Sequence, residues 1–517
     1  MAVSPGTTGR REARLRWAGL GAGPLVGVAV LLLLPGADAD AAGAAVGGLT
    51  GEGRATAAVG ALMAVWWLTE AVPLSATALV PIALLPLVGA RSIGEVTAPY
   101  ADPVIFLFMG GFILGLGMQR WGLHRRIALV TIALVGTQPR RLIAGFMVAT
   151  AVMSMWVSNT ATVAMMVPVG IGVVHLVFAR LGLPDGPDHP SAPAPAANFA
   201  TALMLGIAYA ASIGGVGTLI GTPPNAILKG YVERTYGQQI GFASWLAVGL
   251  PLMAIFLPLA WLYLTRWAFP VRLERIPGGR DMIRDELRSL GPMSRGEWVV
   301  FLVFILTASM WVLRPQIVAA TGLSGLTDEG IAVSAAGALF IIPVNLRERR
   351  FAMDWETASQ LPWGILILFG GGLSLAGAIQ ANGVDRFIGR GFETLSGVHP
   401  FVIVLAVAVG VIFLTEITSN TAVTNTLLPV LGGAGAAAAL GVDAALLLIP
   451  AAVAASYAFM LPVATPPNAI VFGSGYVRLA QMARAGFWLN LAGALLAATM
   501  AYFFAGSLLD LDLRGKG

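Results

Sequence analysis

Cysteine is absent from the 517 residues of this chain, and histidine occurs only four times. Without cysteine the chain can form no disulfide bond, no thiolate metal site and no cysteine nucleophile. The histidines have no paired spacing along the sequence, so no histidine metal site is predicted either. These absences exclude the cysteine-dependent enzymes and argue against a protein metal centre.

Charged residues are also scarce. They make up 11% of the chain, against 57% hydrophobic residues, and the mean hydropathy is +0.81. These values predict a polytopic membrane protein surrounded by lipid, because a soluble chain of this length needs more surface charge. Lys and Arg exceed Asp and Glu by 31 − 26 = 5. They gather in loops, where they orient membrane segments, so no nucleic-acid partner is predicted.

Long apolar runs are present, for example at 17–36 and 487–506, and each is long enough to cross the hydrocarbon as a helix. Arg10, Arg11, Arg14 and Arg16 precede the first run, so the positive-inside rule predicts a cytoplasmic N-terminus. No small-residue cleavage site follows this run, and we interpret it as a retained helix.

A short motif occurs twice in matched apolar settings. Ser-Asn-Thr lies at 158–160 and again at 419–421, which gives an offset of 419 − 158 = 261. A single Ser-Asn-Thr would be interpreted as hydroxyls bonding back to a helix carbonyl. However, the glycine-rich stretch 108–119 matches 369–380 with the same offset of 369 − 108 = 261. We conclude that the chain contains an internal repeat.

A second repeated motif, TPPNA, interrupts apolar runs at 222–226 and 465–469. Two adjacent prolines cannot lie inside a continuous helix, so each copy predicts a helix broken within the membrane. The offset here is 465 − 222 = 243, which is 18 less than 261. The difference is about the length of the proline-rich loop at 181–198, which only the first half carries.

Counting crossings gives the predicted fold. It is an all-α polytopic membrane protein with about eleven transmembrane helices and two re-entrant hairpins in two inverted repeats, because the hairpins enter from opposite sides. The N-terminal tail and extra helix are predicted at 1–54, and a cytoplasmic linker at 271–297. The first repeat is predicted at 55–270, with a cytoplasm-facing hairpin at about 140–180 and a broken helix at 200–231. The second repeat is predicted at 298–517, with an outward-facing hairpin at about 395–436 and a broken helix at 442–476.

The two hairpin tips and the two helix breaks are predicted to meet near the membrane midplane, where inverted-repeat transporters bind their cargo. Their hydroxyl and carbonyl oxygens suit a cation such as Na⁺, and the N–H groups of half-helix N-termini suit an anion. Neither motif contains Arg or Lys. An anion held only by neutral dipoles is costly to bury, so cations bound with it are the expected counter-charge.

The stretch ASYAFMLPVATPPNAIV, at 455–471, resembles the sodium:sulfate/dicarboxylate symporter signature of the divalent anion:sodium symporter family, which includes the INDY-type dicarboxylate carriers. Ser456, Phe459, Pro462, Asn468 and Val471 fall on its fixed positions. The paired Ser-Asn-Thr motifs and the early run WWLTEAVP are similar to the same family. The resemblance implies a homodimer with scaffold and transport domains that works by an elevator movement, and arm helices after Gln119 and Gln380.

The same resemblance implies the site residues. Substrate carboxylates would meet Asn159, Thr160, Thr222, Pro223, Asn420, Thr421, Thr465 and Pro466. One sodium site resembles Ser154, Ser158, Asn159 and Gly221, and its symmetry mate resembles Thr415, Ser419, Asn420 and Ala464. One departure from symmetry is visible, because Gly214 and Gly215 correspond to Tyr457 and Ala458.

The leading hypothesis is a sodium-coupled symporter of a C4 dicarboxylate such as succinate, fumarate or malate, with at least two sodium sites, in the inner membrane of a bacterium. Ser154 and Thr415, one helical turn before each motif, favour sodium. The alternatives are a sodium-independent dicarboxylate exchanger and a sodium-coupled transporter of sulfate or another inorganic oxyanion. An intramembrane enzyme is disfavoured because Glu416 is the sole acidic residue near the motifs, and a channel would not need two closed hairpins.

Overall fold

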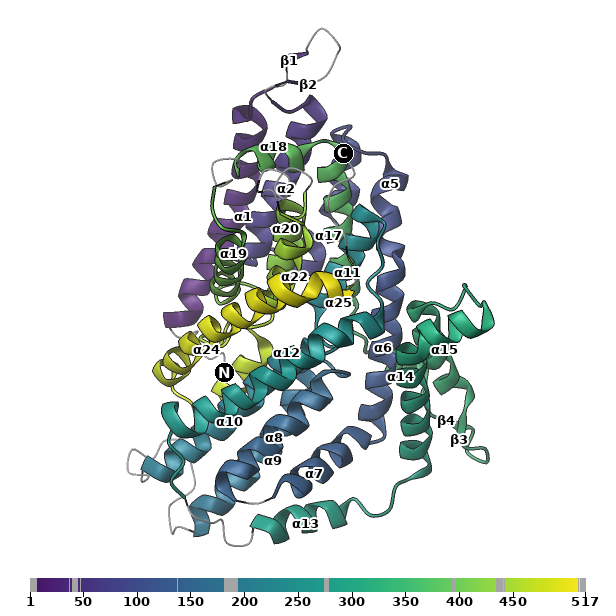
Figure 1. The fold of residues 1–517 in the computed structure, drawn as a ribbon, viewed down its shortest axis with the longest axis vertical. Helices are drawn as coiled ribbons and strands as arrows, with labels where there is room; N and C mark the ends of the chain where they lie inside the picture. Colours follow the sequence, from purple (N-terminus) through teal and green to yellow (C-terminus); the bar gives the residue numbers. More distant parts are fainter. Residues whose placement is uncertain are drawn as a thin grey trace.

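The structure is a computed structural model of the chain. It describes residues 7–36, 38–39, 45–46, 48–136, 138–180, 194–273, 279–392, 397–433, 440, 442–509 and 511. Most of the described chain is helical, and the only strands within it form two short antiparallel pairs (Figure 1). Most of the predicted proline-rich loop, residues 181–193, lies outside the described residues, as do parts of the predicted terminal segments.

The first half of the chain runs to residue 268. Its elements are α1 (Thr7–Leu33), β1 (Asp38–Ala39), β2 (Ala45–Val46), α2 (Gly51–Thr69), α3 (Leu74–Thr77), α4 (Val80–Leu87), α5 (Ile93–Thr97), η1 (Ala98–Ala101), α6 (Pro103–Arg120), α7 (Leu123–Val135), α8 (Pro139–Ser154), α9 (Asn159–Arg180), α10 (Ala194–Gly215), α11 (Pro223–Tyr236), α12 (Phe242–Leu262) and η2 (Tyr263–Ala268).

The second half follows a connecting helix, α13 (Gly279–Ser289), within the predicted linker. Its elements are α14 (Arg295–Thr321), α15 (Asp328–Ile341), β3 (Pro343–Asn345), β4 (Arg350–Phe351), α16 (Trp355–Ala358), α17 (Trp363–Ala381), α18 (Val384–Arg390), α19 (Pro400–Thr415), α20 (Asn420–Leu431), α22 (Ala445–Ala455), α23 (Pro466–Gly473), α24 (Leu479–Met500), η4 (Ala501–Ala505) and α25 (Gly506–Leu509).

Membrane-spanning helices dominate the fold. Within the described residues, eight helices are long and apolar enough to cross a membrane, and shorter apolar helices occur at Leu74–Leu87, Pro400–Thr415 and Ala445–Ala455. Many large apolar side chains on these helices are exposed, which is expected of surfaces that face lipid. The all-α polytopic class is confirmed, and the number of eleven crossings stays a prediction.

Each Ser-Asn-Thr motif lies at the turn of a helix pair. In the first pair α8 ends at Ser154 and α9 begins at Asn159, and in the second α19 ends at Thr415 and α20 begins at Asn420. The two helices of each pair contact one another. Both motifs therefore place a helix N-terminus, with its free N–H groups, directly at the tip of the turn.

Each TPPNA motif lies where a helix stops and restarts. The first interruption separates α10 from α11, and the second separates α22 from α23. Thr222 has φ −145° and ψ 143°, and Thr465 has φ −144° and ψ 147°, so the two breaks share one backbone geometry. In both copies proline occupies the first helical turn, where its missing N–H costs nothing.

The glycine-rich helices α6 and α17 contact each other. Phe108 and Phe369, which are equivalent in the two repeats, meet edge to face with ring centroids 5.1 Å apart. A Cβ at Gly110 would come within 2.6 Å of the Ala332 backbone, and one at Gly371 within 2.3 Å of the Ala78 carbonyl oxygen. These glycines therefore permit close helix packing, as expected for small residues in membrane helices.

Candidate functional site

One cavity of about 450 Å³ brings the repeated motifs together. It is bounded by the two hairpin tips and the two helix breaks, with α3, α6 and α17 on the remaining sides. All eight residues predicted to bind the substrate line it, as do Ser158, Ser419 and Gly221 from the predicted sodium sites. None of the described residues that line this cavity is charged.

Four helix N-termini face this cavity. They are the starts of α9 and α20, which carry the Ser-Asn-Thr motifs, and the starts of α11 and α23, which follow the helix breaks. Each directs the positive end of a helix dipole at the cavity. The starts of α9 and α20 also offer backbone N–H groups that have no partner within their own helix, whereas α11 and α23 begin with two prolines, which have no N–H. The cavity is thus neutral in formal charge but positive in potential, which suits an anion with more than one acidic group.

The first hairpin carries a compact group of oxygens behind its tip. Ser154 is buried, and its Oγ donates a hydrogen bond to Asn159 Oδ1 over 2.5 Å. Gly215 approaches so closely that a Cβ there would lie 2.7 Å from Asn159 Oδ1. Ser154 does not line the cavity, whereas Ser158, Asn159 and Gly221 do. The predicted first sodium site therefore extends from the cavity wall into the buried hairpin.

The second hairpin has the same motif but a different arrangement behind it. Ser419 and Asn420 line the cavity, while Thr415 and Ala464 are buried and do not. Thr415 Oγ1 donates to the carbonyl of Val411 in its own helix over 2.7 Å. A hydroxyl that donates its hydrogen keeps lone pairs, so Thr415 can still be a cation ligand.

Two asparagines of the TPPNA motifs, for which the sequence predicted no role, hold the helix breaks in shape. Asn225 Nδ2 donates to the carbonyls of Thr218 (2.7 Å) and Gly215 (3.3 Å). Asn468 Nδ2 donates to the equivalent carbonyls, of Leu461 (3.0 Å) and Ala458 (3.1 Å). Both asparagines are buried. The signal for them was the repeated Asn in TPPNA, which is needed because an unwound segment leaves carbonyls unpaired.

The Glu416 side chain is buried and does not line the cavity. Its carboxylate accepts hydrogen bonds from the backbone N–H of Met460 (2.8 Å) and Leu461 (2.9 Å) and from Asn490 Nδ2 (2.7 Å). These donors lie in the second helix break and in α24, so Glu416 connects the second hairpin to both. The equivalent position in the first hairpin is Met155, since 416 − 155 = 261.

The chemistry available to the cavity is binding, because its wall combines hydroxyls, amides, prolines and backbone groups. No described residue on the wall pairs a nucleophile with a general base. Helix N-termini can hold carboxylate or sulfate oxygens, and the hydroxyl and amide oxygens at the tips can hold small hard cations.

The chain is similar to known membrane transporters over most of its length. Residues 29–510 match a family described as the sodium:sulfate symporter transmembrane region. The chain is 42% identical over 497 residues to the sodium-dependent dicarboxylate transporter SdcS of Staphylococcus saprophyticus, covering 96% of this chain and 92% of that protein. It is 43% identical over 453 residues to SdcS of Staphylococcus aureus, covering 87% and 86% of the two chains.

A solved structure shares the fold. The crystal structure of the YdaH transporter of Alcanivorax borkumensis superposes with a TM-score of 0.55 and 15% sequence identity, covering 96% of this chain and 99% of that one. At this identity the likeness concerns the fold alone.

Proposed function

Since the chain belongs to the sodium:sulfate symporter family of secondary transporters, we propose that it couples the uptake of a C4 dicarboxylate to the entry of sodium ions. The relatives named sodium-dependent dicarboxylate transporters, which match nearly the full chain, support both the substrate class and the coupling ion. The chain is an integral membrane protein, and it is not an enzyme.

The observation that carries this proposal is the pair of matched anion-binding ends in one neutral cavity. Asn159 and Thr160 begin α9, and Asn420 and Thr421 begin α20, and all four line the cavity. A ligand with two similar carboxylates suits two similar helix N-termini. Thr222 with Pro223, and Thr465 with Pro466, would close the site from the helix breaks.

Sodium ions would supply the positive charge that the cavity wall lacks. We assign one ion to Ser154, Ser158, Asn159 and Gly221, and another to Thr415, Ser419, Asn420 and Ala464. Two sodium ions with one dianion give an electroneutral complex, and each further net charge would add about 2.3 kcal/mol per 100 mV of membrane potential. Bound sodium thereby lowers the cost of burying the dianion, which is the physical basis of coupling.

We further assign the movement to an elevator mechanism in a homodimer, with the N-terminus in the cytoplasm. The hairpins and broken helices would form the transport domain, and α6, α14, α15 and α17 would belong to the scaffold. This division is supported by the site's composition, because the two hairpins and both helix breaks carry the proposed ligands and would have to move as one body.

The test is uptake of labelled succinate into proteoliposomes with an inward Na⁺ gradient, and then with the gradient replaced by internal dicarboxylate in Na⁺-free buffer. We expect uptake only with sodium. Equal uptake by exchange without sodium would make the protein an exchanger. A panel of succinate, fumarate, malate and sulfate, each measured with and without Na⁺, separates the dicarboxylate proposal from an oxyanion transporter.

A further inference from the structure

We propose that the β3–β4 turn and the start of α16 form a foot, residues 341–355, that inserts into one leaflet and binds the headgroups of anionic phospholipids. The foot projects from the C-terminal end of α15, at the side of the molecule away from the hairpins (Figure 1). It contributes nothing to the cavity described above, and it goes beyond the proposed transport function.

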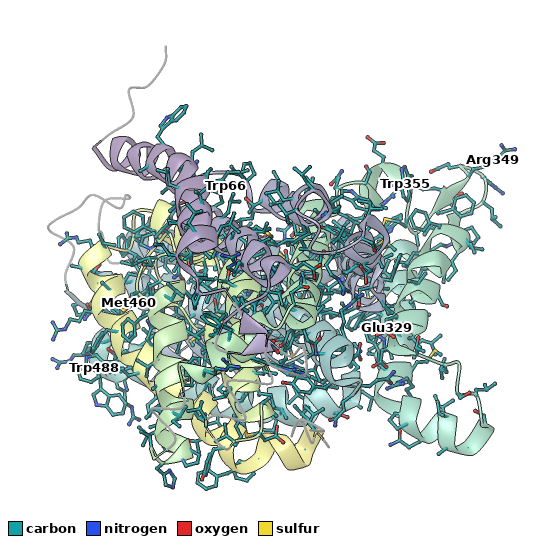
Figure 2. All side chains as sticks on the ribbon, turned by 90° about the horizontal axis from the view of Figure 1, so that it is seen from above. Trp66, Glu329, Arg349, Trp355, Met460 and Trp488 are labelled. Atoms are coloured by element: carbon teal, nitrogen blue, oxygen red, sulfur yellow. The ribbon has the colours of Figure 1, made fainter. Side chains whose placement is uncertain are left out.

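The foot exposes large apolar side chains at its end. Ile341 is 74% exposed, Leu346 is 77% exposed and Trp355 is 68% exposed. Such exposure within one short segment needs an apolar environment. Tryptophan is also typical of the membrane–water interface, because its ring is amphipathic. Figure 2 shows Trp355 and Arg349 at the outer edge of the molecule.

Three arginines follow Leu346 in the turn, with Glu348 among them. Arg347, Arg349 and Arg350 are all exposed, and none of them takes part in an ion pair within the described part of the chain. Arg347 and Arg350, together with Arg295 and one acidic residue, Glu348, line a cavity of about 790 Å³ beside the turn, so its charge is positive on balance. In an anionic leaflet the phosphate groups lie at the surface and the acyl chains lie below them. The arginines of the foot would bind the phosphates, and the neighbouring apolar side chains would contact the acyl chains.

The base of the foot is held rigidly, so these groups are positioned in advance. Trp121 Nε1 donates to the Ala352 carbonyl over 2.7 Å, and the Arg350 guanidinium lies 4.9 Å from the centroid of the Trp121 ring. Arg120 pairs with Asp354 over 2.5 Å. The Thr357 backbone N–H, and then Arg120, lower the pKa of Asp354 to about 2, so this pair is ionised throughout the physiological range.

The tip of the foot has a defined turn as well. Asn345 Oδ1 accepts from the backbone N–H of Arg347 over 3.0 Å, and Arg349 adopts φ +49°. The turn thus presents Leu346 and two arginines together. A soluble anion would not account for the exposed apolar groups, and a second copy of this surface would bring arginine against arginine. An anionic lipid satisfies both features.

The absence of cysteine makes insertion directly measurable, because Leu346→Cys would carry the sole thiol of the chain. With a nitroxide label there, in nanodiscs containing phosphatidylglycerol, we expect high accessibility to oxygen and low accessibility to a water-soluble nickel chelate. Ser289→Cys, on the exposed face of α13, is the control and should show the reverse. Equal accessibility to nickel at both positions would overturn insertion, and spin–spin broadening at Leu346→Cys would instead make the foot an interface between copies.

Headgroup binding is tested by titrating phosphatidylglycerol or phosphatidylcholine into the detergent-solubilised full chain and counting retained lipids by native mass spectrometry. Each arginine near an anionic surface is worth about fivefold in affinity, so Arg347→Gln with Arg349→Gln should weaken phosphatidylglycerol binding by about 25-fold. The matched control is Arg284→Gln with Arg288→Gln on α13, which removes the same charge elsewhere in the chain. This control should bind phosphatidylglycerol as tightly as the wild type does. Equal loss in the two double variants, or no preference for phosphatidylglycerol, would overturn the proposal.

Discussion

The two hairpins carry the same motif at their tips but are attached to the adjacent helix breaks in different ways. The first packs backbone against backbone, because a Cβ at Gly214 would lie 2.3 Å from the Ala151 carbonyl oxygen. At the equivalent position of the second repeat stands Tyr457, whose buried ring packs against Phe256 at a centroid distance of 5.0 Å. There the Glu416 carboxylate makes the connection through the backbone N–H groups of Met460 and Leu461.

The comparison shows that the two repeats are symmetric only in the parts that face the cavity. The parts that face the cavity are equivalent, down to the backbone angles of Thr222 and Thr465. The parts behind them are not, because close glycine packing and a buried carboxylate are two solutions to the same requirement. Each hairpin must be tied to its helix break, and only the atoms that face the ligand need to match.

The largest expected effect tests the symmetric part. Asn159→Ala and Asn420→Ala should each lower sodium-driven succinate uptake by about 100-fold, because each removes a polar ligand to a charged partner. Asn198→Ala, whose amide bonds to the Pro270 carbonyl away from the cavity, is the control and should retain uptake. Wild-type uptake in either tip variant, with a normal thermal midpoint, would remove that asparagine from the site.

A second prediction tests the connection that is present in the second hairpin alone. Glu416→Gln replaces a carboxylate that accepts three hydrogen bonds with an amide whose NH₂ cannot accept any, so a backbone N–H loses its acceptor. We expect a loss of about 1–3 kcal/mol in stability, seen as a lower thermal midpoint. Met155→Leu, at the equivalent position, should change the midpoint little. An unchanged midpoint in Glu416→Gln would contradict the role assigned to the carboxylate.

A third prediction concerns the two hydroxyls behind the tips. Ser154→Ala removes the donor to Asn159 Oδ1 and a proposed sodium ligand, so the half-saturating sodium concentration should rise about tenfold. Thr415→Val should raise it only about threefold, because that hydroxyl bonds to its own helix. Sodium titrations of uptake measure both. A larger rise for Thr415→Val than for Ser154→Ala would contradict this order, and would show that sodium binding depends more on the Thr415 hydroxyl than on the Ser154 hydroxyl.

The smallest expected effect is that of Thr218→Val. Thr218 Oγ1 donates to the Met155 carbonyl, which is the side-chain link between the first helix break and its hairpin. Loss of one neutral hydrogen bond should cost about 1 kcal/mol, less than Glu416→Gln, since close packing at Gly214 remains. Thermal midpoints of the two variants in the same detergent compare them. A greater loss in Thr218→Val would mean that packing does not hold the first hairpin.

Much of the candidate site could be predicted because its parts are repeated and locally constrained. The Ser-Asn-Thr and TPPNA motifs recur in matched apolar runs, and adjacent prolines break a helix in any tertiary context. All eight residues predicted to bind the substrate line one cavity, although their binding roles stay predictions. The role of Asn225 and Asn468 in anchoring the helix breaks was not predicted, because their partners are backbone carbonyls, which a sequence does not distinguish.

The sequence alone therefore determined the membrane class, the family, the repeat and the positions of the helix breaks. Hydropathy, proline geometry and motif spacing act through neighbouring residues, so they can be interpreted before folding is considered. Only the tertiary structure decided how each hairpin is held, with Gly214 against Ala151 in one and Glu416 against Met460 and Leu461 in the other. Such contacts depend on distances of a few tenths of an ångström between segments far apart in the chain, and close packing sets those distances.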